Sequence, residues 1–138
     1  YSGHRNRRSY SNHGAKRMKN LLITLLLISP FSFADWGDVY YCQMTNLDII
    51  SLEGERKSYN YQKFQFKLDQ TKNAMVFGNQ GYFQNDVMEL RENFSFPSQE
   101  TWYADGQFDS AYFGNGKFLY SMTGNSEVMS VSANCDKF

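Results

Sequence analysis

The side chains that could support catalysis in this chain are carboxylates, because histidine is confined to its first segment. Both histidines, His4 and His13, precede residue 35. Residues 35–138 therefore lack the commonest general base and the commonest metal ligand, which excludes Ser-His-Asp, Cys-His and zinc-histidine sites there. The remaining possibility is a glycosidase-like pair of carboxylates. The candidate acids are Asp86, Glu89, Glu92, Glu100, Asp105 and Asp109.

The spacing of these acids matches no recognised catalytic constellation. Asp105 is followed by glycine and fits a turn, whereas Asp86 and Glu89 fit a solvated face. The D-x-[DN]-x-[DN]-G pattern of a calcium loop is missing between Asp105 and Asp109. We therefore expect a protein that is not an enzyme, with no metal ion and no other cofactor.

The charges divide the chain into two parts. Residues 1–34 hold six basic side chains and no acid, whereas residues 35–138 hold 8 basic and 14 acidic ones, a net charge of −6. DNA, RNA and anionic lipid are bound by clustered Lys and Arg. The acidic part is therefore expected to bind no nucleic acid and no membrane surface.

The segment from Met18 to Ala34 has the features of an export signal. Lys19 gives a positive start, an apolar run follows over 21–28, and small residues stand at Ser32 and Ala34. This pattern predicts cleavage between Ala34 and Asp35. A membrane span is excluded, because 21–34 is only 14 residues long with a proline inside, too short for roughly 30 Å of hydrocarbon.

The chain therefore divides into three predicted parts. Residues 1–17 form an extension upstream of the natural start, non-native or disordered, residues 18–34 form the signal peptide, and residues 35–138 form the mature domain. We expect a periplasmic or secreted protein that meets the membrane only transiently, through its signal peptide.

Two cysteines stand near the two ends of the predicted mature domain. Cys42 is near its start and Cys135 is near its end. Paired cysteines usually form disulfides in oxidising compartments, and neither a C-x-x-C motif nor a histidine is present there to activate a thiol. A bond between them closes a loop of about 94 residues, to which chain entropy assigns roughly 4–5 kcal/mol.

The domain that must hold these residues reads as all-β. Apolar and polar residues alternate between turn residues, with no convincing helical run. Asp105-Gly106 predicts a type I′ hairpin turn, and Gly114-Asn115-Gly116 predicts a second hairpin turn. Residues 84–96 fit either a short helix or an edge strand. The expected strands are 40–44, 47–52, 59–68, 74–77, 102–104, 107–113, 118–122 and 129–135.

About eight short antiparallel strands can close on themselves or pack as two sheets. A disulfide between the first and last strands places the two ends of the sheet side by side. This favours a single small barrel over a tight sandwich, because closure also removes exposed strand edges.

Aromatic side chains exceed what a small core needs. Residues 35–138 contain 20 of them, and each can bury roughly 150–250 Å². Neighbouring residues of a strand point to opposite faces, so one ring of each adjacent pair must leave the first layer. Such rings could bind an apolar molecule or a glycan. The expected ligand-binding residues are Tyr41, Tyr82, Trp102 and Tyr112.

The signal peptide, the opening Val39-Tyr40-Tyr41-Cys42, the barrel-like middle and the C-terminal cysteine resemble the periplasmic inhibitors of c-type lysozyme. The resemblance covers the two ends and the strand count, and it carries no site residues. It implies a small β-barrel whose terminal cysteines pair and which inhibits a basic enzyme.

Three functions are therefore open. We expect a non-catalytic binding module for a small apolar ligand or a glycan. The alternatives are a surface inhibitor of a basic envelope-targeting enzyme such as a lysozyme, favoured by the acidic charge, and a structural protein of the envelope. The expected partner is a small ligand or a basic protein.

Overall fold

The computed structural model describes residues 34–92, 95–96 and 100–138. The chain divides into two units, Tyr1–Ser32 and Phe33–Phe138, and all described residues belong to the second. The predicted extension 1–17 and all of the predicted signal peptide except Ala34 lie outside them, so the export signal stays a prediction. Within the described part, no helix is long and apolar enough to cross a membrane.

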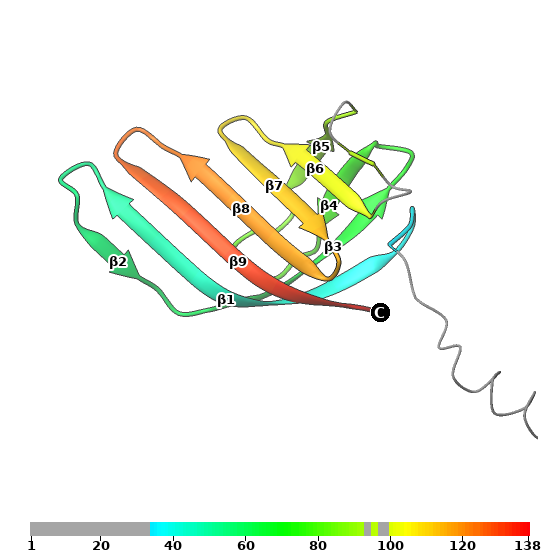
Figure 1. Ribbon diagram of the computed structural model, residues 1–138, viewed down its shortest axis with the longest axis horizontal. Coiled ribbons are helices and arrows are strands. Elements are labelled where there is room, and N and C mark those ends of the chain that lie inside the picture. The colour runs from blue at the N-terminus through cyan, green and yellow to red at the C-terminus, as the bar shows by residue number, and fades with distance from the viewer. Residues whose placement is uncertain (1–33, 93–94, 97–99) are drawn as a thin grey trace, which may run out of the picture. The chain divides into compact units, whose positions relative to one another are not determined.

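The described residues form nine antiparallel strands and no helix (Figure 1). Eight of them pair in the order β1-β3-β4-β5-β6-β7-β8-β9, and β9 pairs back onto β1, which closes a barrel. The predicted all-β class is confirmed, and so is the barrel. The strands are β1 Val39–Ser51, β2 Arg56–Ser58, β3 Lys63–Asp69, β4 Ala74–Phe77, β5 Val87–Leu90, β6 Thr101–Asp105, β7 Asp109–Gly114, β8 Lys117–Thr123 and β9 Glu127–Lys137.

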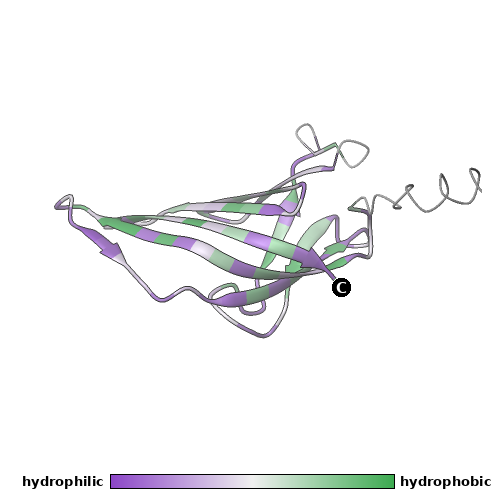
Figure 2. Cartoon of the chain, turned by 60° about the horizontal axis from the view of Figure 1, so that its bottom comes forward, coloured by the Kyte–Doolittle hydropathy of each residue, from purple (hydrophilic) through white to green (hydrophobic). Residues whose placement is uncertain are grey.

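The two-residue alternation of the sequence separates the inside of the barrel from its outside, and Figure 2 shows it as alternating colours along the strands. Along β9, for example, Met129, Val131 and Ala133 are buried while the serines between them face outward. A strand that is apolar on one face only is typical of a sheet with one face against a core.

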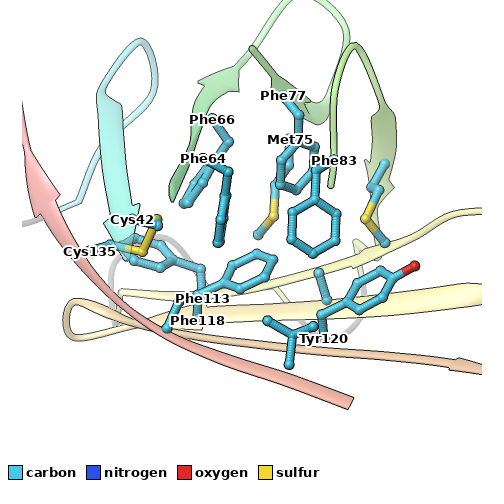
Figure 3. Packing of buried hydrophobic residues seen from close by; sticks show 14 of the residues in the cluster. Cys42, Phe64, Phe66, Met75, Phe77, Phe83, Phe113, Phe118, Tyr120 and Cys135 are labelled. Carbon is cyan, nitrogen blue, oxygen red and sulfur yellow. A yellow bond between two sulfur atoms is a disulfide. The ribbon is translucent and has the colours of Figure 1, made fainter. Parts of the chain in front are cut away.

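Aromatic rings fill the interior (Figure 3). The ring of Phe118 is fully buried, with its centroid 5.0 Å from that of Phe64 and 5.8 Å from that of Phe66. Phe83, from the loop between β4 and β5, adds a further ring 5.6 Å from Phe118. An eight-stranded barrel is just wide enough for side chains to fill it, and these rings do so.

The predicted disulfide is present between β1 and β9. Cys42 and Cys135 are direct cross-strand partners, and their Cα atoms lie 4.0 Å apart. The bond therefore joins the first strand to the last at the seam where the barrel closes.

Two predicted strands, 40–44 and 47–52, are one strand. β1 runs through both, with a bulge at Thr45, because Met44 pairs with Ala133 and Asn46 pairs with Ser132. The extra residue shifts the inward positions from even to odd numbers. The expectation of a break was therefore wrong: the change of phase marks a bulge and not a turn.

Two further expectations are resolved within the described residues. In the open segment 84–96, residues 87–90 form strand β5, so the alternative of a helix there is wrong. The predicted strand 59–68 is shorter, because Tyr59 and Tyr61 lie in the connection between β2 and β3.

The hairpin predicted at Asp105-Gly106 forms, but its turn lies elsewhere. The Gly106 N–H donates to the Asp109 carbonyl over 3.0 Å, so the chain reverses at Gln107 and Phe108. Neither Asp105 nor Gly106 has a positive φ, which a type I′ turn requires at both central residues. The second predicted hairpin turn is confirmed, because Asn115 and Gly116 have φ of 49° and 71°.

Candidate functional site

Adjacent aromatic residues send one ring inward and one ring outward. Tyr41 is 47% exposed and Tyr82 is 37% exposed, while the rings beside them are buried. Tyr112 also faces outward and is partly buried. Trp102 is different: it is fully buried, and its neighbour Tyr103 takes the outward position.

The four predicted ligand-binding residues do not form one site. Tyr41 belongs to β1 and lines a hollow together with residues of β3 and β9. Tyr112 belongs to β7 and lines a different hollow, together with residues of β6, β8 and β9. Tyr82 lies in the loop between β4 and β5, where its hydroxyl is 3.8 Å from the sulfur of Met122. Trp102 packs in the interior with its ring 5.0 Å from that of Trp36.

One of the four, Tyr112, belongs to a group of outward residues that we call the tyrosine face. Tyr103 and Tyr112 are cross-strand partners with ring centroids 5.0 Å apart. Leu119, 53% exposed, is the partner of Tyr112 on β8. Figure 1 shows the strands β6 to β9, which carry this face, side by side. A hollow of about 400 Å³ is lined by Tyr103, Tyr112, Leu119, Arg91, Ser110, Ser121 and Ser130, together with parts of the strands beneath them.

A charged fork borders the tyrosine face. Two guanidinium nitrogens of Arg91 donate to the two carboxylate oxygens of Asp105. Arg91 also donates to the hydroxyl of Ser110 over 3.1 Å, and that hydroxyl donates to Asp105 over 2.9 Å. These bonds lower the pKa of Asp105, the largest cause being the hydrogen bond from Arg91. Asp105 is therefore held as an anion and is unsuited to act as a general acid.

Backbone hydrogen bonds fix the position of Tyr103. Its N–H donates to the hydroxyl of Ser95, which in turn donates to its carbonyl, each over 2.9 Å. The same carbonyl accepts the N–H of Arg91 over 2.8 Å. These bonds hold the main chain of Tyr103 in place, which helps to preorganise a binding surface.

The register of β7 and β8 positions the other two apolar residues of the face. Asn115 and Gly116 form the two-residue turn between the strands, with Gly114 paired to Lys117. A turn of this length fixes the register, and the fixed register brings Tyr112 opposite Leu119.

Three residues of the tyrosine face and its border were not predicted from the sequence as members of a site: Tyr103, Leu119 and Arg91. The signal that could have identified Tyr103 was its position beside Trp102, since only one of the two can face the core. Leu119 and Arg91 have no local signal, because each joins the face through pairing between strands.

Two of the candidate acids meet in a second hollow, at the hairpin loop between β6 and β7. This acid hollow, of about 240 Å³, is lined by Asp86, Asp109, Phe108 and Met122 among others. Burial, and to a smaller extent the charge of Asp109, raises the pKa of Asp86. Asp109 accepts a hydrogen bond of 2.8 Å from the Tyr120 hydroxyl, and the pKa of Tyr120 is raised mainly by burial.

The acid hollow brings two carboxyl groups to the hairpin loop between β6 and β7. Burial and the charge of Asp109 both disfavour the ionised form of Asp86, and a positive charge beside it would favour that form. Within residues 34–92, 95–96 and 100–138, no group of three or more His, Cys, Asp or Glu side chains could hold a metal ion.

Comparison with known proteins assigns no relationship. No protein-family model, no curated protein and no solved structure matches this chain.

Proposed function

We propose that this protein is an exported, non-catalytic module that binds a neutral glycan on its tyrosine face. The observation that carries the proposal is the pair of outward rings, Tyr103 and Tyr112, 5.0 Å apart and continued by Leu119. Rings on the solvent side of a barrel add nothing to its core. An apolar floor with a polar border is the usual composition of a small-molecule site.

The border of the face supplies the hydrogen bonds that a sugar needs. Hydroxyl groups of a glycan both donate and accept, and so do the hydroxyls of Ser110, Ser121 and Ser130. The fork of Arg91 and Asp105 provides a planar donor beside an acceptor. The hollow of about 400 Å³ falls within the range of about 300–1,000 Å³ found for small-ligand sites.

A small apolar ligand is supported less well than a glycan. Such a ligand would need the barrel interior, and there Phe64, Phe66 and Phe118 pack directly against one another. The tyrosine face is open and bordered by charge, which an apolar ligand would have to desolvate.

Isothermal titration calorimetry tests the glycan proposal. Purified protein is titrated with neutral cello-, chito- and malto-oligosaccharides, and the expected result is binding of at least one series. Tyr112→Ala should then weaken the affinity at least tenfold. Tyr61→Ala is the matched control, because Tyr61 is 51% exposed but lies outside the tyrosine face. Binding of none of the three series, or equal loss in both variants, would contradict the proposal.

Export is tested by expressing the chain from Met18 and weighing the periplasmic product. The expected denatured mass begins at Asp35 and is two hydrogens light because of the disulfide between Cys42 and Cys135. A product that retains residues 18–34 would contradict export with cleavage. Cleavage after Ala34 would remove contacts that the structure shows: the Ala34 N–H donates to the Glu100 carboxylate over 3.0 Å, and the Ala34 side chain is buried.

A second candidate function is inhibition of a basic envelope-targeting enzyme, and the acid hollow favours it. The net charge of −6 over residues 35–138 would steer a basic partner. Phe108, 68% exposed, stands beside Asp86 and Asp109, so an apolar anchor adjoins two carboxylates. Salt-sensitive binding to hen lysozyme, lost in Asp109→Asn and kept in Tyr112→Ala, would support this function over the glycan module.

A further inference from the structure

We propose that the glycan is bound as an extended chain, which runs from the tyrosine face across β9 and ends in a third hollow, at Tyr41. This inference rests on the proposed function, and it adds that the ligand is a polymer. It is carried by a continuous row of outward side chains that joins the two hollows.

The row follows direct cross-strand partners. Tyr103 pairs with Tyr112, Tyr112 with Leu119, and Leu119 with Ser132. The hydroxyl of Ser132 is 2.9 Å from that of Thr45 on β1, which the bulge turns outward. Five strands are crossed in this way, a width of about 19 Å at the usual strand spacing of about 4.8 Å. In Figure 1 these strands, β6, β7, β8, β9 and β1, lie next to one another.

The hollow at Tyr41 begins where the row ends. Asn134 follows Ser132 on the same face of β9 and pairs with Gln43, and Asp136 pairs with Tyr41. We call this site the polar hollow; its volume is about 480 Å³. The ring of Tyr41 lies 5.4 Å from that of Phe138. The outward side chains that line the polar hollow are Tyr41, Gln43, Lys63, Gln80, Asn134 and Asp136.

The chemistry of the row and of the polar hollow fits a neutral, hydroxyl-rich chain. The row itself carries no charged side chain, and the hydroxyls of Ser132 and Thr45 can each donate and accept. In the polar hollow, between the opposite charges of Lys63 and Asp136, the amide of Gln80 adds both kinds of partner. The amide of Asn134 adds a donor, since its oxygen accepts from the Lys117 ammonium. The net charge of −6 over residues 35–138 repels an acidic polymer. A short sugar can fill one hollow, whereas only an extended chain can reach both.

Dependence of the affinity on chain length tests this inference. Cello-, chito- and malto-oligosaccharides from the disaccharide to the hexasaccharide are titrated into the wild type, Tyr41→Ala and Tyr112→Ala. The wild-type affinity should rise at least tenfold along the series that binds. Tyr41→Ala should bind the disaccharide normally but lose that rise, and Tyr112→Ala should bind every length weakly. Tyr59→Ala, equally exposed but outside both hollows, should match the wild type.

An NMR measurement on the wild type makes the test independent of the variants. The side-chain amide signals of Gln80 and Asn134 should move with the hexasaccharide and stay fixed with the disaccharide. The inference is wrong if the wild type binds all lengths equally, or if Tyr41→Ala binds the hexasaccharide normally. The proposed function fails separately, if no oligosaccharide binds or if binding does not depend on Tyr112.

Discussion

The two faces of strands β6 to β8 carry the same kinds of residue for different reasons. On the inner face, Trp102, Phe113 and Phe118 are buried in the core. On the outer face, Tyr103, Tyr112 and Leu119 form a second apolar row that the core does not need. The inner rings are explained by packing. The outer rings lie on the solvent side of the barrel, outside its core, and this difference is the reason for assigning them a ligand.

The comparison predicts its largest effect on the inner face. Phe118→Ala should lower the free energy of unfolding by about 3–5 kcal/mol, because it removes a ring packed against four others and leaves a cavity. Urea denaturation of the purified variant measures the loss. A loss below about 1 kcal/mol would mean that the interior is not packed as described.

The disulfide should have the next largest effect on stability. Replacing both Cys42 and Cys135 with alanine should cost about 2–5 kcal/mol, because the bond closes most of the chain into one loop. Denaturation of the double variant beside the wild type measures the cost. Affinity for a disaccharide, which is bound at the tyrosine face alone, should be unchanged under conditions where the variant is folded, since Cys42 adjoins only the polar hollow.

The outer face should show the reverse pattern. Tyr112→Ala should change the free energy of unfolding by about 1 kcal/mol or less, as partly exposed side chains usually do, while weakening glycan binding at least tenfold. Tyr112→Phe, which keeps the ring, should retain most of the affinity. A stability loss as large as that of Phe118→Ala would show that Tyr112 is structural and would remove the contrast between the faces.

The fork beside the tyrosine face should give a smaller, pH-dependent effect. The pKa of Asp105 is lowered in the folded protein by Arg91, so its contribution to stability is present above the unfolded value of about 3.9. That contribution is lost as the pH falls through the lower folded value. Asp105→Asn should therefore have a lower melting temperature than the wild type at pH 7, and the difference should shrink as the pH falls below about 3.9. Equal melting at pH 7 would show that the fork is energetically neutral.

The smallest expected effect has the opposite sign. The pKa of Asp86 is raised in the folded protein by burial and by Asp109, so ionised Asp86 opposes folding above its unfolded pKa. Asp86→Asn should be at least as stable as the wild type at pH 7, and its advantage should vanish in acid. A clear drop in melting temperature at pH 7 would contradict the unfavourable burial and repulsion assigned to ionised Asp86.

Local patterns were sufficient to predict the all-β class and the closure of the barrel. Alternation identified the inward residues of β1, β3, β8 and β9, and the positions of Cys42 and Cys135 predicted a closed barrel, which the structure confirms. The bulge at Thr45 was not predicted, because one inserted residue changes the phase of alternation as a short turn does.

The candidate site could be predicted only in part, because it depends on register. A type I′ turn at Asp105-Gly106 would have paired Tyr103 with Phe108, whereas its partner is Tyr112. A turn displaced by two residues thus separates or joins the two rings. Tyr112 was predicted as a ligand-binding residue from its aromatic neighbour, but the row to Leu119 and Ser132 is visible only once strands are paired.

The most direct test of the central claim is an NMR titration that compares the two faces in one experiment. Isotope-labelled protein receives the neutral oligosaccharide that binds. The backbone signals of Tyr103, Tyr112 and Leu119 should shift, while the indole N–H of Trp102, buried and without a hydrogen-bond partner within the described residues, should stay fixed. A shift of the Trp102 indole signal without any shift of Tyr103, Tyr112 and Leu119 would place the ligand inside the barrel and contradict binding on the tyrosine face.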